Sequence, residues 1–424
     1  MKLQLPKGTR DFPPEEKIVR DKIVETLKNC FELYGYSPLE TPALERYEVL
    51  SSKYTGGDEI LKETFKLKDQ GNRDLGLKYD LTVPMCRFIA MNPQIKLPFK
   101  RYQIQTVWRD GPTAAGRYRE FLQGDIDIVG CKSVIADAEI ISATDFVFKK
   151  LELDIVIKIN TRKLLNDILA YCGVKNKDFD TIMLSIDKLE KFGEKIVRDE
   201  LIEKGVKKEI IRKIIETITI KGTNKEKIKK IKPILKNSEG LKEIEELLNY
   251  LDILDVKVDF DVSLARGLAY YTGPIYEFIP KKSIIKTSLA GGGRYDEMIG
   301  DLLGSKKEYP ATGVSFGVDR IYDAYVEKKK IKQKTVAKVY IIPIKTINQS
   351  LNIAKKLREK NIKVDIDLLD RGPSKNLQYA NSLGIPFVIF IGDEELKQNK
   401  VKLRDMKTGK ELLLTVEEVI KKLK

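Results

Sequence analysis

The sequence of 424 residues contains no histidine. This absence excludes an imidazole general base, a catalytic triad that depends on histidine and any histidine-ligated metal site. Chemistry in this chain must therefore use carboxylates, arginines, tyrosines, backbone amides or the groups of its substrates. A reaction whose nucleophile is already ionised at neutral pH remains possible, because it needs alignment and charge neutralisation rather than a base.

Cysteines are also few, and no long hydrophobic run occurs. The four cysteines are far apart and stand in mainly apolar contexts: Cys30, Cys86, Cys131 and Cys172. We therefore expect buried thiols, with neither a disulfide framework nor a protein-ligated zinc ion or other protein-held metal. No stretch approaches the length of a membrane span, and residues 1–10 lack the apolar core of a signal peptide. These features predict a soluble, cytoplasmic protein without a membrane partner.

Positive charge is in excess. Lys and Arg number 78 against 63 Asp and Glu, a formal net charge of +15 at pH 7. Such a balance favours a polyanionic partner through the release of counterions, although many lysine-rich proteins have none. The length allows two or three domains, each with its own core.

A predicted β-hairpin gathers three arginines. Strand-forming stretches at 101–108 and 121–129 flank a tip at 111–116 that holds small residues and one proline. Arg109, Arg117 and Arg119 would therefore lie close together at the base of the hairpin. Two interpretations stay open from these residues: an anion bound between the guanidinium groups, or a solvated hairpin whose arginines pair with nearby carboxylates.

The same segment resembles motif 2 of class II aminoacyl-tRNA synthetases, in the form found in the histidyl-tRNA synthetase family. The resemblance rests on Arg109, a short loop, the run Gly-Arg-Tyr-Arg-Glu-Phe at 116–121 and Gln123. Residues 264–273 and 290–296 are similar to two histidine-specific signatures of that family, and residues 313–320 to class II motif 3. Four motifs in the expected order are specific evidence, and the resemblance extends over nearly the whole chain.

The resemblance implies an α+β fold with three parts. Residues 1–328 would form the class II catalytic domain, whose antiparallel sheet is flanked by helices. Residues 160–250 are predicted to be helical and rich in lysine, and look like an insertion domain. Its basic face either covers the acceptor end of tRNA or is a solvated helix surface. The segment 36–42 resembles motif 1, with Pro42 as its proline, and this implies a homodimer.

Alternating strand and helix patterns predict a small mixed α/β domain with parallel strands at 335–424. It resembles the anticodon-binding domain shared by the histidyl, prolyl, threonyl and glycyl enzymes. We expect strands at 336–342, 364–368, 387–391 and 401–404, and helices at 348–360, 374–383 and from 416 onward.

The family chemistry would activate histidine with ATP to histidyl-adenylate, release pyrophosphate, and transfer the histidyl group to the terminal adenosine of tRNA(His). The resemblance implies that Arg109 holds the α-phosphate and the substrate carboxylate, that Arg320 holds the γ-phosphate, and that Arg266 contacts the α-phosphate. Arg109 and Arg266 are thus the expected catalytic residues. Further ATP contacts are expected from Arg117, Arg119 and Glu120, and Mg²⁺ is expected to arrive with the nucleotide.

A second set of residues is expected to bind histidine. Asp80 and Thr82 match the positions that bind its α-amino group in the family. Gln123 and Asp127 stand four residues apart on a predicted strand, so both side chains point to one face. The full expected set is Asp80, Thr82, Arg109, Gln123, Asp127, Arg266, Tyr270, Tyr271 and Tyr295. For Tyr270, a place in a core strand is the competing interpretation. Gly291, Gly292 and Gly293 are expected to allow close packing of the backbone rather than to bind phosphate.

Two departures from the family pattern limit this transfer. Ala269 stands where many members have Asp, and the tip Thr113-Ala114-Ala115 lacks side chains for bidentate base contacts. Two other functions also remain open. One is a noncatalytic histidine-binding paralogue, the regulatory subunit of ATP phosphoribosyltransferase, and the other is an RNA-binding regulatory module. The presence of Arg109, Arg266 and Arg320 argues against the first.

Overall fold

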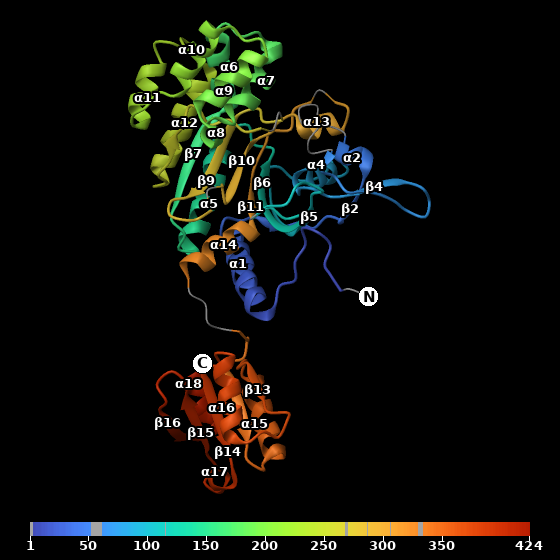
Figure 1. Cartoon of the computed structure of the whole chain (residues 1–424), viewed down its shortest axis with the longest axis vertical. Helices are drawn as coiled ribbons and strands as arrows, with labels where there is room; N and C mark the ends of the chain where they lie inside the picture. The colour runs from blue at the N-terminus through green and yellow to red at the C-terminus, as the bar shows by residue number, and fades with distance from the viewer. Residues whose placement is uncertain are drawn as a thin grey trace. The chain divides into compact units, whose positions relative to one another are not determined.

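The computed structural model describes residues 3–51, 62–114, 116–267, 270–285, 287–305, 307–329 and 334–424. The chain forms two compact units, one of Met1–Arg10 with Ile23–Lys328 and one of Asp11–Lys22 with Lys329–Lys424. Figure 1 shows the elements of both. Ala115 and Ala269, at which the sequence departs from the family pattern, lie outside the described residues.

The larger unit is built on one sheet. Among the described residues, eight strands follow the order β1-β5-β6-β11-β10-β9-β7-β8. The neighbours are antiparallel except at the two edges, where β1 pairs with β5 and β7 with β8 in parallel. The strands are β1 Ser37–Pro38, β5 Phe99–Trp108, β6 Glu120–Val129, β7 Ile155–Thr161, β8 Asp259–Phe260, β9 Pro274–Pro280, β10 Ala290–Arg294 and β11 Ala311–Gly317.

One face of this sheet is apolar and carries helices. On β11, Phe316 packs against Phe31 of α1 (Pro14–Leu33) and Phe148 of α5 (Ile135–Lys150), with ring centroids 5.3 and 6.1 Å apart. Phe148 also contacts Phe278 of β9 at 6.0 Å. Because side chains alternate along a strand, the residues next to these aromatics point to the opposite face. That second face carries the polar residues described below.

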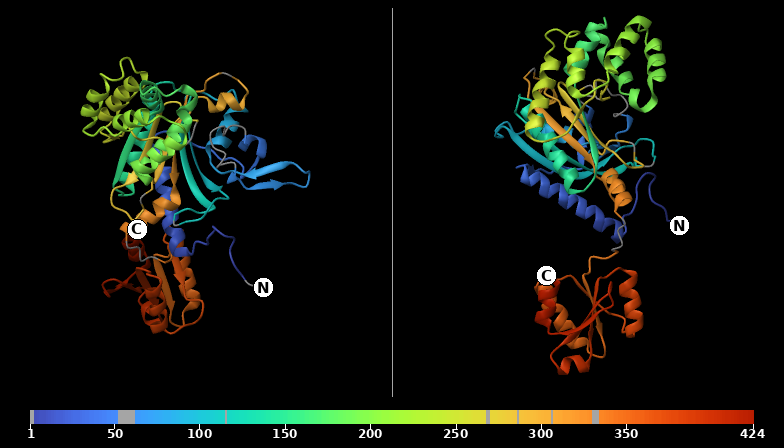
Figure 2. Two further views of the ribbon diagram at one scale, coloured as in Figure 1. Left: turned by 45° about the horizontal axis from the view of Figure 1, so that its top comes forward. Right: turned by 90° about the vertical axis from the view of Figure 1, so that its left-hand side faces the viewer.

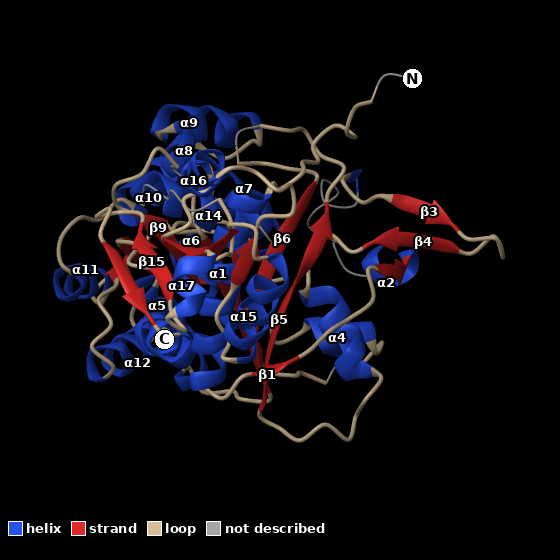
Figure 3. Cartoon of the chain, turned by 90° about the horizontal axis from the view of Figure 1, so that it is seen from below, coloured by secondary structure: helices blue, strands red, loops and turns tan. Residues whose placement is uncertain are grey.

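Helices and a small sheet surround the central sheet. The short elements of this region are α2 Tyr47–Ser51, α4 Thr82–Ala90, α13 Met298–Leu302 and α14 Val318–Lys328. Strands β2 (Leu44–Arg46), β4 (Asp74–Leu77) and β3 (Lys66–Lys68) form an antiparallel ribbon that projects from the unit in Figure 2 and Figure 3. The hairpin expected at 101–129 is confirmed as β5 and β6.

The helical character expected for 160–250 is confirmed. Figure 1 shows the helices gathered beside β7. In α10, Ile211, Ile214, Ile215 and Ile218 are buried at helical spacing. The elements are α6 Arg162–Tyr171, a 3₁₀ turn Asn176–Asp178, α7 Phe179–Ile186, α8 Leu189–Phe192, α9 Glu194–Glu203, α10 Lys208–Ile218, α11 Asn224–Ile231 and α12 Glu239–Ile253.

The C-terminal part is the expected mixed α/β fold, with one difference. In the order β13-β12-β14-β15-β16, the first three strands are parallel and the last two are antiparallel. Only residues 392–400 join β14 to β15, too few for the crossover that a parallel strand needs. The sequence patterns missed β16 and α17. The elements are β12 Val339–Pro343, α15 Ile347–Glu359, β13 Val364–Ile366, α16 Pro373–Ser382, β14 Phe387–Ile391, α17 Asp393–Lys397, β15 Val401–Asp405, β16 Glu411–Leu414 and α18 Val416–Leu423.

The cysteines and the hydropathy add two findings. Cys30, Cys86 and Cys172 are buried, whereas Cys131 is partly exposed, so the expectation of burial was wrong for it. Its place in the loop after β6 explains this difference. Among the described helices, none is long and apolar enough to cross a membrane.

Candidate active site

The second face of the central sheet carries a polar floor made by β5, β6 and β11. Arg101 of β5 lies directly opposite Asp127 of β6, and the pairs that follow are Gln103 with Asp125 and Gln105 with Gln123. On β11 the residues opposite these acids and Gln123 are Gly313, Ser315 and Gly317. Large polar side chains thus stand beside small residues, which leaves hollows above β11 and β10.

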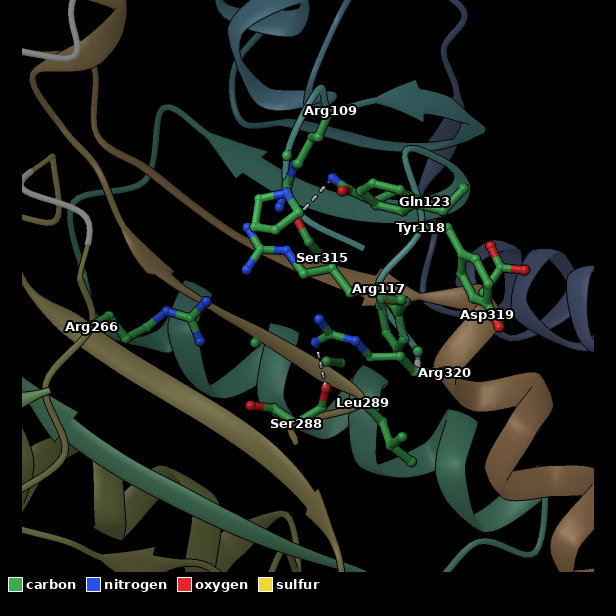
Figure 4. Close-up of a pocket in the computed structure, with 18 residues that line it drawn as sticks. Arg109, Arg117, Tyr118, Gln123, Arg266, Ser288, Leu289, Ser315, Asp319 and Arg320 are labelled. Atoms are coloured by element: carbon green, nitrogen blue, oxygen red, sulfur yellow. Dashed lines mark hydrogen bonds between the residues drawn. The ribbon is translucent and has the colours of Figure 1, made fainter. Parts of the chain in front are cut away.

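The larger hollow is a cavity of about 290 Å³ between the hairpin, β10, β11 and the start of α14. Figure 4 shows the guanidinium groups of Arg109, Arg117, Arg266 and Arg320 directed toward it from different elements. Its other lining residues are Gly111, Pro112, Gly116, Tyr118, Phe121, Gln123, Ser288, Leu289, Ala290, Gly291, Ser315, Phe316, Gly317 and Asp319. The structure therefore brings together the motif 2 arginine, the motif 3 arginine and Arg266.

Positive charge is concentrated around this cavity. Burial lowers the pKa of Arg320, and the nearby guanidinium groups of Arg109 and Arg117 lower it further. Burial also acts to lower the pKa of Arg266, but Tyr271 and Glu277 outweigh it and raise the pKa above its ordinary value. Glu277 lies 3.1 Å from Nη1 of Arg266. Because cations that disfavour one another's charge gain from an anion placed among them, the cavity suits a polyanionic ligand.

Protein contacts hold the two hairpin arginines of the cavity wall. Nε of Arg109 donates to the carbonyl of Tyr79 at 3.1 Å, and its guanidinium lies 5.2 Å from the ring of Phe121. Arg117 forms an ion pair with Glu63 at 2.6 Å. The anion interpretation therefore fits Arg109, whereas Arg117 already has a carboxylate partner.

Two expected ATP contacts do not line the cavity. Arg119 pairs with Asp110 at 3.0 Å and donates to the carbonyl of Gly111, so its guanidinium braces the hairpin. Glu120 is exposed and accepts a hydrogen bond from Nε1 of Trp108 at 2.8 Å. For these two residues the contacts agree with the second interpretation of the hairpin, in which its arginines pair with nearby carboxylates and its surface faces solvent.

A smaller cavity of about 20 Å³ adjoins the first and shares Gly291 and Ser315 with it. Thr82 and Asp127 are in its wall, and the hydroxyl of Tyr295 donates to Oδ1 of Asp127. The cavity is lined by Thr82, Asp127, Tyr270, Tyr271, Gly291, Gly292, Gly293, Tyr295, Gly313, Val314 and Ser315. A volume of this size holds about one water molecule. An imidazole ring therefore requires movement of the surrounding side chains.

The three tyrosines form one cluster. Tyr270 lies 4.7 Å from Tyr271 and 6.3 Å from Tyr295, measured between ring centroids. Tyr270 precedes β9 and lines the small cavity, so it is not a strand residue, but it does pack against a buried hydrophobic cluster. Because the loop before β9 follows no strand ladder, both neighbouring tyrosines can face the same cavity.

Two further expected residues take different positions. Gln123 lines the larger cavity, and its Nε2 donates to Asp125 at 3.0 Å and to Ser315 at 3.4 Å. Gln123 and Asp127 do lie on the same face of β6, as the spacing predicts. Asp80 is buried but outside both cavity walls, and its Oδ1 accepts a hydrogen bond from the backbone N–H of Val83.

The glycine run at 291–293 packs closely, as expected. A Cβ at Gly291 would overlap the guanidinium of Arg266, and one at Gly292 would overlap the carbonyl oxygen of Gly313. At Gly293 it would lie 2.6 Å from the carbonyl oxygen of Pro274. The glycines therefore let β10 approach its neighbours and leave room for Arg266.

Sequence reasoning missed three residues of the site. Ser315 lines both cavities. Arg101 lies opposite Asp127 on β5, Asp125 stands two residues before Asp127 on β6, and both are buried. One signal was present: Arg101, Gln103 and Gln105 alternate with Tyr102 and Ile104 along the strand. Three polar residues on one face of an interior strand indicate a polar site, because unpaired polar groups are costly to bury.

Comparison with known proteins identifies the family. The sequence model of the family described as histidyl-tRNA synthetase matches residues 8–321. The chain belongs to the histidyl-tRNA synthetase family. A second model, described as an anticodon-binding domain, matches residues 338–424. The expected class II fold with its C-terminal anticodon-binding domain is thereby confirmed.

Relatives of this family match over the whole length. The histidine–tRNA ligase 1 of Bacillus cereus is 44% identical over 98% of this chain and 98% of its own. The histidyl-tRNA synthetase structure from Nostoc sp. has a TM-score of 0.88 and 30% identity, and the match covers 100% of this chain and 99% of that one. A Bacillus halodurans structure described as an ATP phosphoribosyltransferase regulatory subunit/histidyl-tRNA synthetase has a TM-score of 0.76 and 21% identity, covering 91% and 97%. That last likeness concerns the fold alone.

Proposed function

We propose that this chain is a histidine–tRNA ligase that joins histidine to tRNA(His) in two steps driven by ATP. The observation that carries this proposal is the adjacency of two cavities on one sheet face. One presents four guanidinium groups, and the other presents Asp127 and three tyrosines. The first suits the phosphates of ATP, and the second suits a ring that donates an N–H group.

In the first step, an oxygen of the histidine carboxylate attacks the α-phosphorus of ATP. A new P–O bond forms, the bond to the bridging oxygen of the β-phosphate breaks, and pyrophosphate leaves with the electron pair. Arg109 and Arg266 neutralise charge at the α-phosphate, and Arg320 holds the γ-phosphate end. The carboxylate is ionised at neutral pH, so the step needs no general base. Arg117 contacts the phosphates after its ion pair with Glu63 breaks. Arg119 acts indirectly, because it holds the hairpin in place through Asp110 and Gly111.

Magnesium fits this site as a companion of the nucleotide. Among the described residues, no group of three or more acidic, cysteine or histidine side chains could hold a metal ion. The carboxylate in the cavity wall is Asp319, which accepts from Arg10 and from the backbone N–H of Leu122. Mg²⁺ would therefore be held mainly by phosphate oxygens and water, and would neutralise charge on the leaving pyrophosphate.

Histidine recognition uses the polar floor. Gln123, Asp127, Tyr271 and Tyr295 surround the imidazole ring, and Thr82 with Asp80 binds the α-amino group once the tyrosines have moved. A side chain that cannot satisfy these buried groups leaves them unpaired, which can give discrimination of roughly 10⁴-fold. In the second step, a ribose hydroxyl oxygen of the terminal adenosine attacks the adenylate carbonyl carbon, the bond from that carbon to the phosphate oxygen breaks, and AMP leaves with the electron pair. The hydroxyl proton passes to a phosphate oxygen of the adenylate.

The parts of the chain have separate tasks in this proposal. Residues 1–328 are the catalytic domain, the helical segment 160–250 is an insertion near the tRNA, and residues 335–424 bind the anticodon. The molecule works as a homodimer through motif 1 around Pro42. The dimer and the role of the insertion rest on the family resemblance.

Amino-acid-dependent exchange of pyrophosphate into ATP tests the proposal. We expect exchange with histidine alone among the standard amino acids. Arg266→Ala should lower the exchange rate by roughly 10²- to 10³-fold, because a preorganised charge at the α-phosphate is lost. Histidine binding without any exchange by the unmodified protein would contradict the proposal and favour a histidine sensor.

A further inference from the structure

A buried charge cluster adjoins the wall of the small cavity. Nη2 of Arg101 is 2.7 Å from Oδ2 of Asp127 and 3.8 Å from Oδ2 of Asp125. The side chains are 0%, 3% and 2% exposed, respectively. One guanidinium thus faces two carboxylates at a place without access to solvent. If both acids are ionised, the cluster carries one uncompensated negative charge.

The hydrogen bonds of the cluster are incomplete. Among the described residues, Nε of Arg101 and Oδ2 of both acids have no hydrogen-bond partner of good geometry. Arg101 instead donates through Nη1 to Gln103 at 3.2 Å and through Nη2 to the carbonyl of Leu81 at 3.3 Å. Dry, incompletely paired ions lower stability relative to an apolar core of the same volume. A purely structural role therefore explains the cluster poorly.

The cluster is connected to the small cavity through Asp127. Asp127 is a wall residue of that cavity, and its Oδ1 accepts from Tyr295. Asp125 accepts from Gln123, which lines the larger cavity. Arg101 itself lines neither cavity and so can affect a ligand only through the two acids.

We propose that Arg101 is a positioning residue for histidine recognition, and that with Asp125 it sets the negative charge that Asp127 presents to the imidazole ring. This inference rests on the proposed function. Arg101 keeps Asp127 ionised and oriented, so that its carboxylate can accept the ring N–H. Asp125 competes for the same guanidinium, and the ligand's N–H supplies a hydrogen bond to Asp127, whose Oδ2 has no hydrogen-bond partner among the described residues.

The pKa shifts of Asp125 and Asp127 support these roles. Burial, opposed by the charge of Arg101 and reinforced by that of Asp127, raises the pKa of Asp125 to about 7. Burial also raises the pKa of Asp127, while Arg101 and the hydrogen bond from Tyr295 act to lower it. The other titratable groups that interact with this cluster are Cys86 of α4, Tyr36 before β1, Lys78 after β4 and Tyr295 after β10.

Two substitutions should shift the pH profile in opposite directions. Arg101→Met removes the cation, so Asp127 ionises only at higher pH. The acidic limb of the pH profile of kcat/KM for histidine should therefore move to higher pH by about one unit. Asp125→Asn removes the competing carboxylate, so the limb should move to lower pH. In the exchange assay, Arg101→Met should also raise KM for histidine roughly 10²-fold with little change in KM for ATP. Arg101→Lys should recover part of this loss.

Arg162→Met is the matched control. Arg162 is a buried arginine of α6 that pairs with Asp180 in the helical segment. Its loss should lower stability without moving the acidic limb. A folded Arg101→Met protein with the KM and pH profile of the unmodified chain would overturn the inference. If Arg101→Met does not fold, an unchanged acidic limb of the pH profile in Asp125→Asn would overturn the inference. Failure of the unmodified chain to exchange with histidine would instead count against the proposed function.

Discussion

At the scale of single residues, Asp367 shows how a buried carboxylate holds a loop in place. It follows β13, and its oxygens accept hydrogen bonds from the backbone N–H groups of Leu369 and Arg371 and from the side chains of Arg371 and Asn376. Burial alone would raise the pKa of Asp367, but the hydrogen bonds from Asn376 and Arg371 outweigh it and lower the pKa from 3.8 to about 2. The ionised form therefore stabilises the folded state.

Asp367→Asn should destabilise the C-terminal part by about 2 kcal/mol at neutral pH. The pKa is lower in the folded state, so this contribution is fully present above the ordinary pKa of 3.8 and is lost as the pH falls through about 2. Urea unfolding of the whole chain, followed by hydrogen exchange of C-terminal peptides, would measure it. Asp370→Asn, at an exposed neighbour, is the control. A difference between Asp367→Asn and the unmodified chain that persists unchanged at pH 2 would contradict this account.

At the scale of elements, the close approach of β10 and β11 shapes the site. Gly292 of β10 pairs with Val314 of β11, and a Cβ at Gly292 would overlap the backbone oxygen of Gly313. A backbone atom cannot turn away as a flexible side chain can, so any larger residue must separate the strands. The floor of the small cavity would move with them.

Gly292→Ala should therefore cost roughly 1–3 kcal/mol of stability and reduce histidine-dependent exchange strongly. Thermal unfolding and the exchange assay would measure the two effects. Gly71→Ala is the control, because a Cβ there would approach only the side chains of Asp69 and Arg73. Full exchange activity in Gly292→Ala would show that the strand spacing does not control the site.

At the scale of the whole molecule, the expected catalytic residues all lie in one of the two compact units. Both cavities are lined by residues within 82–320, and the anticodon-binding match begins at 338. Adenylate formation and the reading of the anticodon are therefore expected to be separable.

A chain that ends at Lys328 should retain histidine-dependent exchange and lose most aminoacylation of tRNA. We expect aminoacylation to fall roughly 10²-fold or more, because the second tRNA-binding module is missing. Parallel exchange and aminoacylation assays on the full and shortened chains would measure both steps. Equal loss of the two activities would mean that the catalytic unit depends on the C-terminal part for its own structure.

Local patterns predicted much of this architecture. The arms of the hairpin and the strand at 387–391 follow from apolar or alternating runs next to turn residues. Strand β16 and the short helix α17 were missed, because Glu411–Leu414 and Asp393–Lys397 are too short for a periodic signal. Arg101 and Asp125 were missed because polar residues that alternate along a strand are also typical of a solvent-exposed face, and only the interior place of β5 and β6 in the sheet distinguishes the two.

The sequence by itself determined the motifs, their order, the family they resemble and the types of residue available for chemistry, since these are properties of the chain. Only the tertiary structure decided which arginines line the larger cavity, that Arg119 and Glu120 do not, and that Arg101 lies between two acids. Those facts depend on strand register and on contacts between segments far apart in sequence. For example, Arg101 meets Asp127 across a hairpin of β5 and β6. Pairing of this kind is fixed by the packing of the whole sheet and not by any local stretch of sequence.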